Sequence, residues 1–557
     1  MGMGWRKVGD DRQELCRLLD YLLGGVQTLK SSVQSGRRLG GEGEMKVDLK
    51  ELWYSGSYRH RAGDSNHPTI QETQMALRQM KDAKSLLSTI SKSLDEAIQT
   101  ITDDTFDDCR AAGFSLLPDD LLTYIFEMHV EDSVSSEQYM FYNRAPRNLA
   151  SVSKHFRRVA LAHSGIWKHN SLGDSRESLL LYKERCPNPI IHIHKSDDIP
   201  SAEADKLHMY PSQQWRGLRI TYRDKEDGHL YFRDLNPIIE TPLAALEDLM
   251  ICNDNMFARR DEFGQLIPRS IHLDGDSLRT LSSWQMPKLT HLDLRNVLPL
   301  APLQCGNVTS LTVNVKTYCG QSEDLNVVAF RNLLQSMPKI QSLHIALRDM
   351  DRTFNETSSD PVSLPDLTSL RFEVGGTTSN LVINQIMELV DTSTLTRLTL
   401  KFFLIGEHVL DGCVSAIFDR KSSTSRVGHI AFMKVEEFSL EVTSFRISDG
   451  TFISMFSAIP NAHTISLELP ENVELPFADI PKKLGVLQRL RSLHIKFPRR
   501  LTDYYTNHLI NLNRFFKNGN CKELEKLEVD YQRPVYATMA KAHLREMLGE
   551  RVYLMDD

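Results

Sequence analysis

Two short clusters of polar residues in this sequence could do chemistry. His192 and His194 alternate along the segment IIHIH, so a strand would place both imidazoles on one face, as two metal ligands require. Asp119 and Asp120 are adjacent carboxylates, and paired carboxylates can act as acid and base. No further His or Cys stands at a metal-ligand spacing, and neighbouring helical residues point about 100° apart. We therefore interpret the histidines as polar strand residues and the aspartates as the first turn of a helix.

The sequence lacks the motifs that mark common enzyme classes. It has no Walker A loop, no GxGxxG after a strand, no HExxH, no GxSxG and no paired CxxC. We expect no catalytic residues, no metal and no cofactor. A divergent enzyme whose site the sequence pattern conceals remains an alternative, to be tested with hydrolase probes or nucleotides.

Composition indicates a globular protein with more than one folded unit or an extended repeat array. The chain has 557 residues, of which 41% are hydrophobic and 25% charged. Its formal net charge of -7 disfavours nucleic acid as the main partner. Eight widely spaced cysteines favour a reducing compartment, and no apolar run is long enough to span a membrane. We expect a cytoplasmic or nuclear protein that does not associate with membranes.

The first part of the chain is predicted to contain a tail and a helix. Residues 1–67 include a stretch rich in Gly, Ser and charge, which predicts a flexible tail. Over 68–108 apolar residues recur every three or four positions, which predicts an amphipathic N-terminal helix. This helix could form a short coiled coil between two copies, or it could pack against its own chain.

A small helical block is predicted over 113–172. Pro118 suits the start of a helix because it lacks the N–H that is unsatisfied there, and Asp119 and Asp120 favour the positive end of the helix dipole. Apolar residues then recur at helical spacing over 121–126 and again, on a later helix, over 149–160.

From 173 to 557 the dominant feature is a recurring L-x-x-L-x-L segment. The middle apolar residue stands at 343, 370 and 398, which are 27 and 28 residues apart, and at 438, 465 and 493, which repeat those intervals. Such a period is typical of leucine-rich repeats. Segments with helical spacing lie between copies, as at 381–390 and 451–459. We therefore expect an α/β fold, an irregular solenoid of one strand plus one helix per repeat with a curved parallel sheet. Further copies are suspected at 188–193 and 268–273.

The helical block resembles the F-box family. Residues 117–126 read LPDDLLTYIF, residues 149–160 read LASVSKHFRRVA, and Ile166-Trp167 closes the unit. The family pattern runs roughly LPxEIxxxIF, then LxxVCKxW, then LW. Ser153 replaces the usual Cys and Phe156 the usual Trp, and the link between the two helices is longer than usual. An F-box followed by leucine-rich repeats is frequent among fungal F-box proteins, so the resemblance extends across most of the chain.

The resemblance implies a substrate-recognition subunit of a Skp-cullin-F-box (SCF) ubiquitin ligase. The F-box would bind a Skp-family adaptor, which joins a cullin-RING ligase core, and the repeats would bind an unknown protein substrate. Such a chain contributes no bond-making residue and acts by proximity. A cullin-independent F-box and repeat scaffold is the alternative.

The residues expected to carry these contacts form two sets. On the F-box, the adaptor-binding residues are expected to be Leu117, Pro118, Leu121, Ile125, Phe126, Val152 and Phe156. Side chains that alternate with the strand leucines should face the concave surface and bind the target. They are His291, Asp293, Arg295, Arg371, Glu373, Arg397, Lys401, His494 and Lys496.

Overall fold

In the computed structural model the chain forms two compact units, Met1–Pro118 and Asp119–Asp557. The structure describes residues 117–135, 144–194, 206–222, 242–254, 271–273, 275–316, 325–350, 361–403, 407–418, 432–443, 449–468, 489–497 and 523–531, with scattered positions elsewhere. In the first unit, Arg78, Lys92, Thr100 and the other described positions between them are helical and exposed. The predicted tail and the apolar stripe of the predicted 68–108 helix lie outside the described residues.

The second unit begins with a small group of helices. They are α4 (Asp119–Ser135), α5 (Arg144–Val152), α6 (Lys154–Ala162) and the 3-10 helix η3 (Ser164–Trp167). The expectation of a single later helix over 149–160 is wrong, because the chain breaks at Ser153. This residue is extended, with φ -154 and ψ 169, and its hydroxyl accepts a hydrogen bond of 3.1 Å from the Phe156 N–H. Ser153 is thus the N-cap of α6. Because α4 reaches Ser135, the link to α5 is also shorter than the sequence suggested.

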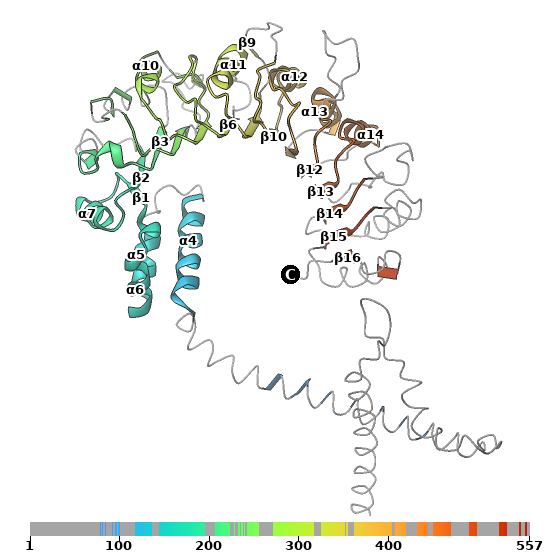
Figure 1. Ribbon diagram of the computed structural model, residues 1–557, viewed down its shortest axis with the longest axis horizontal. Coiled ribbons are helices and arrows are strands. Elements are labelled where there is room, and N and C mark those ends of the chain that lie inside the picture. The colour runs from blue at the N-terminus through green and yellow to red at the C-terminus, as the bar shows by residue number, and fades with distance from the viewer. Residues whose placement is uncertain are drawn as a thin grey trace, which may run out of the picture. The chain divides into compact units, whose positions relative to one another are not determined.

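In the part of the chain that the structure describes, one open parallel sheet of 14 strands follows, with its strands side by side in chain order (Figure 1). The α/β class with a parallel sheet is therefore confirmed. The strands are β1 (His169–Ser171), β2 (Ile190–His194), β3 (Gly217–Tyr222), β4 (Asp248–Asn253), β5 (His291–Arg295), β6 (Ser310–Lys316), β8 (Ser342–Arg348), β10 (Ser369–Gly375), β11 (Arg397–Phe403), β12 (Glu437–Val442), β13 (Thr464–Glu468), β14 (Ser492–Phe497), β15 (Lys526–Tyr531) and β16 (Val552–Tyr553). A separate pair is formed by β7 (Leu325–Asn326) and β9 (Thr353–Phe354).

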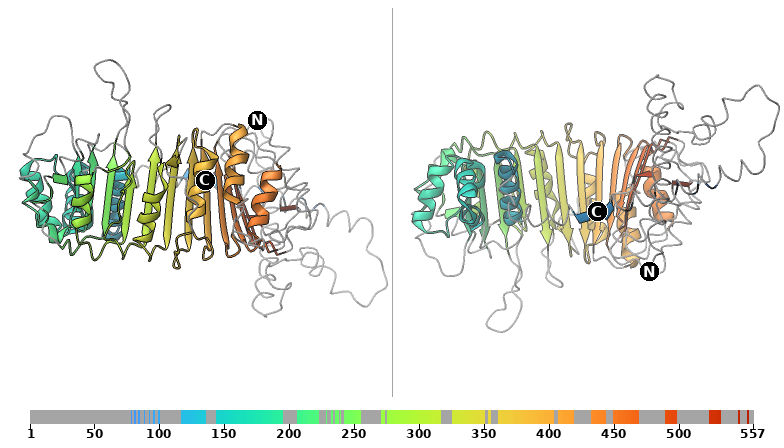
Figure 2. Two further views of the ribbon diagram at one scale, coloured as in Figure 1. Left: turned by 90° about the horizontal axis from the view of Figure 1, so that it is seen from above. Right: turned by 90° about the horizontal axis from the view of Figure 1, so that it is seen from below.

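Helices cover one face of the sheet and leave the other face open (Figures 1 and 2). They are α7 (Arg176–Arg185), α10 (Gly275–Ser283), α11 (Val327–Gln335), α12 (Asn380–Leu389), α13 (Glu407–Phe418) and α14 (Asp449–Ala458), with a short 3-10 helix η4 (Ser212–Gln214). The expectation of a helix in every repeat is wrong for the connection from β5 to β6. Residues 296–309 contain no helix there, because Leu292 and Leu311 stand only 19 residues apart.

The core lies between the strands and these helices. Strand residues alternate, so Leu292 and Leu294 of β5 are buried while their neighbours face the open side. On α14, Phe452, Met455 and Phe456 are buried as their helical spacing predicted. The suspected copy at 268–273 does not form a strand of the large sheet; its described part makes only an isolated bridge from His272 to Leu298. The core is continuous from one strand to the next. Stacking of neighbouring units therefore buries the apolar faces that a single unit could not bury alone.

Asn296 fixes the ends of three neighbouring strands. It adopts φ 53, in the left-handed region that asparagine tolerates. Its side-chain amide donates to the Asn253 carbonyl at the end of β4 at 3.1 Å, and its side-chain oxygen accepts from the Lys316 N–H at the end of β6 at 2.8 Å. These bonds hold β4, β5 and β6 in register where the open face forms a cavity.

Candidate interaction surfaces

Helix α4 carries two apolar stripes, one buried and one exposed. Leu122, Phe126 and Val130 point into the helical group, where the Phe126 and Phe156 rings pack edge to face with centroids 5.0 Å apart. The structure therefore places two of the predicted adaptor-binding residues in the core, since Phe126 is 1% exposed and Phe156 is 8% exposed. Their role is to hold α4 against α6.

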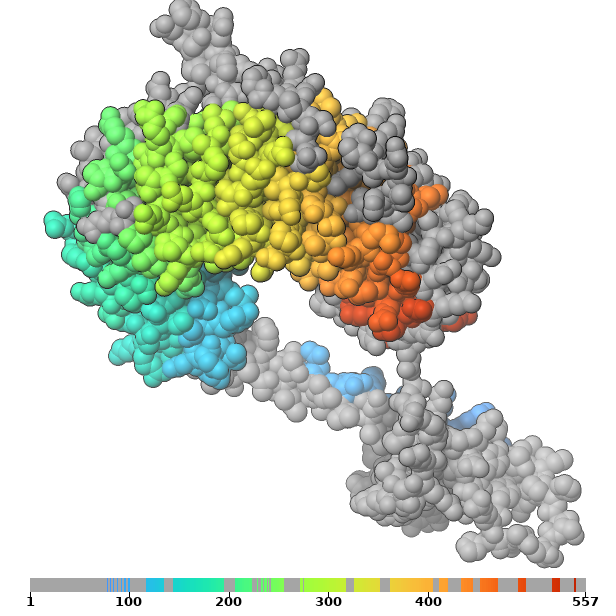
Figure 3. Space-filling view, turned by 45° about the horizontal axis from the view of Figure 1, so that its top comes forward, coloured from blue at the N-terminus to red at the C-terminus, as the bar shows by residue number. Residues whose placement is uncertain are grey.

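The second stripe of α4 is open to solvent. Its residues are spaced at i, i+3, i+4 and i+7, and they are Leu121, Tyr124, Ile125 and Met128, which we call the α4 apolar face. Leu121 is 48% exposed, and Val152 on α5 is 64% exposed. Figure 3 shows α4 in light blue beside the teal surface of the helices that follow. Sequence reasoning missed Tyr124 and Met128, although their helical spacing from Leu121 was visible.

The remaining two predicted adaptor residues precede α4. Leu117 is half-buried and Pro118 is exposed, and both belong to the Met1–Pro118 unit. The structure thus leaves Leu121, Ile125 and Val152 as the predicted residues of the second unit that present apolar surface to a partner.

Polar contacts on α4 tie it to the elements around it. The Asp119 carboxylate lies 2.7 Å from His155 Nε2 and 3.1 Å from the Arg158 guanidinium, both on α6. The hydrogen bond with His155 is the main reason that the pKa of Asp119 is lowered. Glu127 lies 2.6 Å from His163 Nε2. Asp119 therefore serves to position α6 as well as to begin α4.

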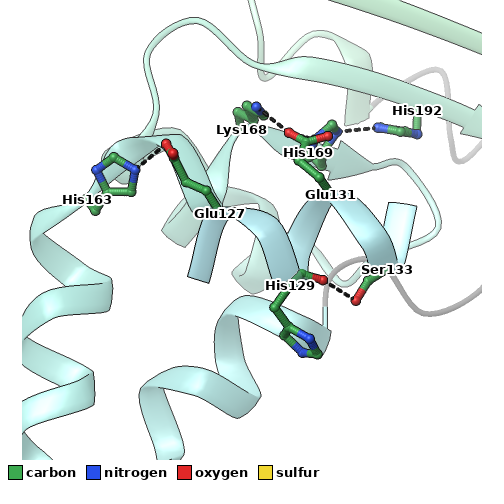
Figure 4. A network of polar contacts seen from close by, with 8 residues as sticks. All are labelled: Glu127, His129, Glu131, Ser133, His163, Lys168, His169 and His192. Atoms are coloured by element: carbon green, nitrogen blue, oxygen red, sulfur yellow. Dashed lines mark hydrogen bonds and ion pairs between the residues drawn. The ribbon is translucent and has the colours of Figure 1, made fainter. Parts of the chain in front are cut away.

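A buried histidine network joins the end of α4 to the first strands of the sheet (Figure 4). Glu131 lies 2.5 Å from Lys168 Nζ and 3.5 Å from His169 Nε2, and His169 Nδ1 lies 3.0 Å from His192 Nε2. Both hydrogen bonds of His169 are made when it donates from Nε2 to Glu131 and accepts at Nδ1 from His192. The His169 hydrogen bond, followed by Lys168, lowers the pKa of Glu131 to about 2.

Both imidazoles of this network are neutral at neutral pH. Burial lowers the pKa of His169, and it lowers the pKa of His192 further. Burial also lowers the pKa of His194 to about 4. His192 contacts His169, and the described residues contain no group of three or more His, Cys, Asp or Glu side chains arranged to hold a metal ion.

All nine predicted target-binding residues lie on the open face of the sheet, but they do not form one cluster. Each stands beside a buried residue on β5, β10, β11 or β14, so its side chain points away from the core. They are spread across the sheet, because β6 and β8 lie between β5 and β10, and β12 and β13 lie between β11 and β14.

Most of the charged residues among these nine form ion pairs on the open face. Along single strands, Arg295 lies 2.8 Å from Asp293 and Arg371 lies 2.6 Å from Glu373. Pairs between neighbouring strands are Arg397–Glu437 at 2.7 Å, Lys401–Glu441 at 2.6 Å and Lys496–Glu468 at 3.1 Å. This part of the face presents paired charges rather than a field of one sign. The sequence also places Glu437 and Glu441 on this face. Sequence reasoning missed Glu468 and all three pairings between strands, because only the register brings the partners close.

The open face is hollowed near α4 by a cavity of about 330 Å³. It is lined by Glu131, Val134, His192, His194, Arg219, Thr221, Asp248, Met250, His291, Leu292, Asp293, Arg295, Ser310 and Thr312. Three of the predicted target-binding residues, on β5, meet here. The cavity is polar, and its walls carry both guanidinium and carboxylate groups. It can bind a polar group, but it offers no arrangement of nucleophile and base among these lining residues.

Comparison with known proteins gives no further guide. No protein-family model matches the chain, and no curated protein matches it either. None of the helices in the described part of the chain combines the length and apolar composition needed to cross a membrane.

Proposed function

We propose that this chain is the substrate-recognition subunit of an SCF-type ubiquitin ligase in the cytoplasm or nucleus. In this proposal α4, α5, α6 and η3 form an F-box, and the parallel sheet with its helices is an irregular leucine-rich-repeat solenoid. The F-box binds a Skp-family adaptor, and the adaptor brings a cullin-RING core to a target held on the open face. The chain itself is not an enzyme.

The observation that carries this proposal is the α4 apolar face. Four large apolar side chains lie open along one side of a helix whose other side is fully packed. A small helical group has few apolar residues to spare from its own core, so an exposed stripe of this length favours a partner. Its residues lie within and just after the LPDDLLTYIF segment that resembles the F-box.

The mechanism that follows is positioning. The helical group leads directly into the sheet, since Trp167 of η3 is buried and His169 already belongs to β1. The Trp167 indole donates to the Ala160 carbonyl at 2.7 Å and packs on Tyr182 of α7, with ring centroids 5.5 Å apart. A target on the sheet would be held at a fixed distance from the adaptor, which raises its effective concentration near the activated ubiquitin.

The test is a pull-down of the full-length chain with probes for the adaptor and the cullin. The variant Leu121→Lys, Ile125→Lys, Met128→Lys places three charges on the α4 apolar face. The matched control, Leu180→Lys, Val328→Lys, Leu381→Lys, makes the same change at exposed apolar residues of α7, α11 and α12. We expect the wild type and the control to retain both partners, and the first variant to bind at least tenfold less adaptor.

The alternative outcomes are distinct. Circular dichroism of both variants shows whether each has folded. Adaptor without cullin would favour the cullin-independent scaffold. If neither partner binds the wild type, the F-box proposal is wrong.

A further inference from the structure

The cavity beside α4 gathers several buried polar atoms that have no hydrogen-bond partner among the described residues. Over β10 to β14 the cations lie against carboxylates, as in the pairs Arg397–Glu437 and Lys401–Glu441. In the cavity, Arg219 Nε and Thr221 Oγ1 are buried and have no hydrogen-bond partner in the described protein, and Thr221 is only 6% exposed. Buried donors of this kind are costly unless water or a ligand meets them.

Unmatched acceptors stand opposite these donors. The Oδ1 atom of Asp293 is buried without a hydrogen-bond partner in the described residues, although Oδ2 binds Arg295. The Asp248 carboxylate makes no hydrogen bond or ion pair within that same part of the chain. Burial raises the pKa of Asp248. The cavity thus holds two donors and two acceptors that a ligand could satisfy.

The register of the sheet separates donors from acceptors. Arg219, Met250 and Asp293 are side by side on β3, β4 and β5. Thr221 stands two residues after Arg219, and Asp248 stands two residues before Met250, so all five side chains share one face. The donors are on β3, and Asp248, on β4, is one strand from them. Asp293, on β5, lies two strand spacings, about 10 Å, from Arg219. Met250, nearly buried, lies between them.

This arrangement disfavours a ligand group that carries either a negative or a positive charge. A carboxylate that met Arg219 would lie near Asp248 and Asp293, and an ammonium that met those carboxylates would lie near Arg219 and Arg295. A primary carboxamide avoids both conflicts, because its oxygen accepts two hydrogen bonds, its nitrogen donates two, and it is neutral. It also enters a partly buried site at a lower desolvation cost than an ion.

We propose that the cavity is the recognition pocket for the target and that it takes the side-chain carboxamide of Asn or Gln in an extended segment. The oxygen is placed toward Arg219 and Thr221, and the amide nitrogen toward Asp293, which stands in the same row as Arg219. The volume of about 330 Å³ leaves room for the flanking backbone of the segment. This inference rests on the proposed function, because it assumes that the open face binds a protein target.

A random heptapeptide phage library selected on the full-length chain tests the inference. We expect the enriched peptides to share one Asn or Gln. Replacing that residue by Asp, Glu or Leu should weaken binding by roughly ten- to a hundredfold, since each change leaves buried donors or acceptors unsatisfied.

Variants of the chain locate the binding. Thr221→Val keeps the side-chain shape and removes the hydroxyl, and Arg219→Met removes the guanidinium; each should lose at least tenfold in affinity for the selected peptides. Arg279→Met removes an exposed guanidinium from α10, on the helix-covered side of the sheet, and should leave affinity unchanged. The inference is overturned if no peptides are enriched, if they share an acidic or basic residue instead, or if Arg219→Met and Thr221→Val bind as the wild type does.

The adaptor pull-down keeps this result separate from the proposed function. Selection of carboxamide peptides by a chain that binds no adaptor would support the pocket and reject the ligase. Adaptor binding without carboxamide selection would reject the pocket alone.

Discussion

His169 and His192 are buried histidines in contact with each other, so their protonation affects stability. Both imidazoles are nearly inaccessible to solvent. Their hydrogen bond needs at least one neutral ring, because one nitrogen must accept the hydrogen that the other donates. If both rings were protonated, two N–H groups would face each other at 3.0 Å and the hydrogen bond would be lost. The network links α4 to β1 and β2, so protonation would loosen the helical group from the sheet.

We predict that the free energy of unfolding falls as pH drops below 6.5. Burial lowers the pKa of His169 and His192 from the ordinary 6.5, so the unfolded chain takes up protons first. The stability due to these groups is complete above pH 6.5 and decreases by at most about 1.4 kcal/mol per pH unit for each histidine. Urea denaturation between pH 7.5 and 5 measures it.

Two variants show whether these histidines cause the decrease in the free energy of unfolding. His192→Gln keeps a donor for His169 and removes one titrating ring, so its stability should change less with pH. His208→Asn alters an exposed histidine and should follow the wild type. A His192→Gln variant whose stability changes with pH as much as that of the wild type would contradict the assignment. Below about pH 4.5, protonation of Glu131 removes a further contribution, since its pKa is lowered to about 2.

At the scale of single elements, the helical group depends on the contact between α4 and α6. Phe156 fills the space beside Phe126, whereas Val152 at the end of α5 projects into solvent. Both residues occupy positions that the F-box resemblance marks for adaptor binding. In the structure Phe156 is buried and Val152 is exposed.

We predict opposite effects of truncating these two side chains. Phe156→Ala should destabilise the helical group by about 3–5 kcal/mol, because it leaves a cavity against Phe126. Val152→Ala should change stability by less than about 0.5 kcal/mol, as exposed substitutions do. Hydrogen exchange of the α4 and α6 amides measures both. Equal protection in the two variants would show that the ring contact does not hold these helices together.

The sequence predicted the strands well and the surfaces less well. The L-x-x-L-x-L pattern located strands such as β10 and β11 because it combines strand alternation with buried leucines. In contrast, LLTYIF offers apolar residues on both sides of α4, and periodicity alone does not say which side is packed. The break at Ser153 was also missed, although a serine three residues before the Phe156 amide it caps is a common helix start.

The charge pairs and the cavity could not be derived from the sequence. Arg397 and Glu437 are 40 positions apart, and they meet only because β11 and β12 pair in parallel with Arg397 beside Glu437. The cavity in turn requires β3, β4 and β5 to be in register and α4 to lie near them. Because the spacing between repeats is uneven, the sequence does not show which residues of neighbouring strands lie side by side.

At the scale of the whole second unit, stability is distributed from strand to strand. Each inner strand of the sheet pairs only with the two beside it, and the helix-covered core is built from the same neighbours. A stacked array of this kind behaves approximately as a row of units with nearest-neighbour coupling. A local defect should therefore weaken the strands around it more than distant strands.

Phe372→Ala tests this behaviour. Phe372 lies on β10 with no exposed surface, and its loss should cost about 3–5 kcal/mol. We expect hydrogen exchange to accelerate in β8, β10 and β11, while β2, β3 and β4 keep most of their protection. Val328→Ala, at an exposed position of α11, should leave both groups unchanged. Uniform acceleration over all strands would show that the sheet unfolds as one cooperative body. In that case, a defect at β10 would also open the cavity between β3 and β5.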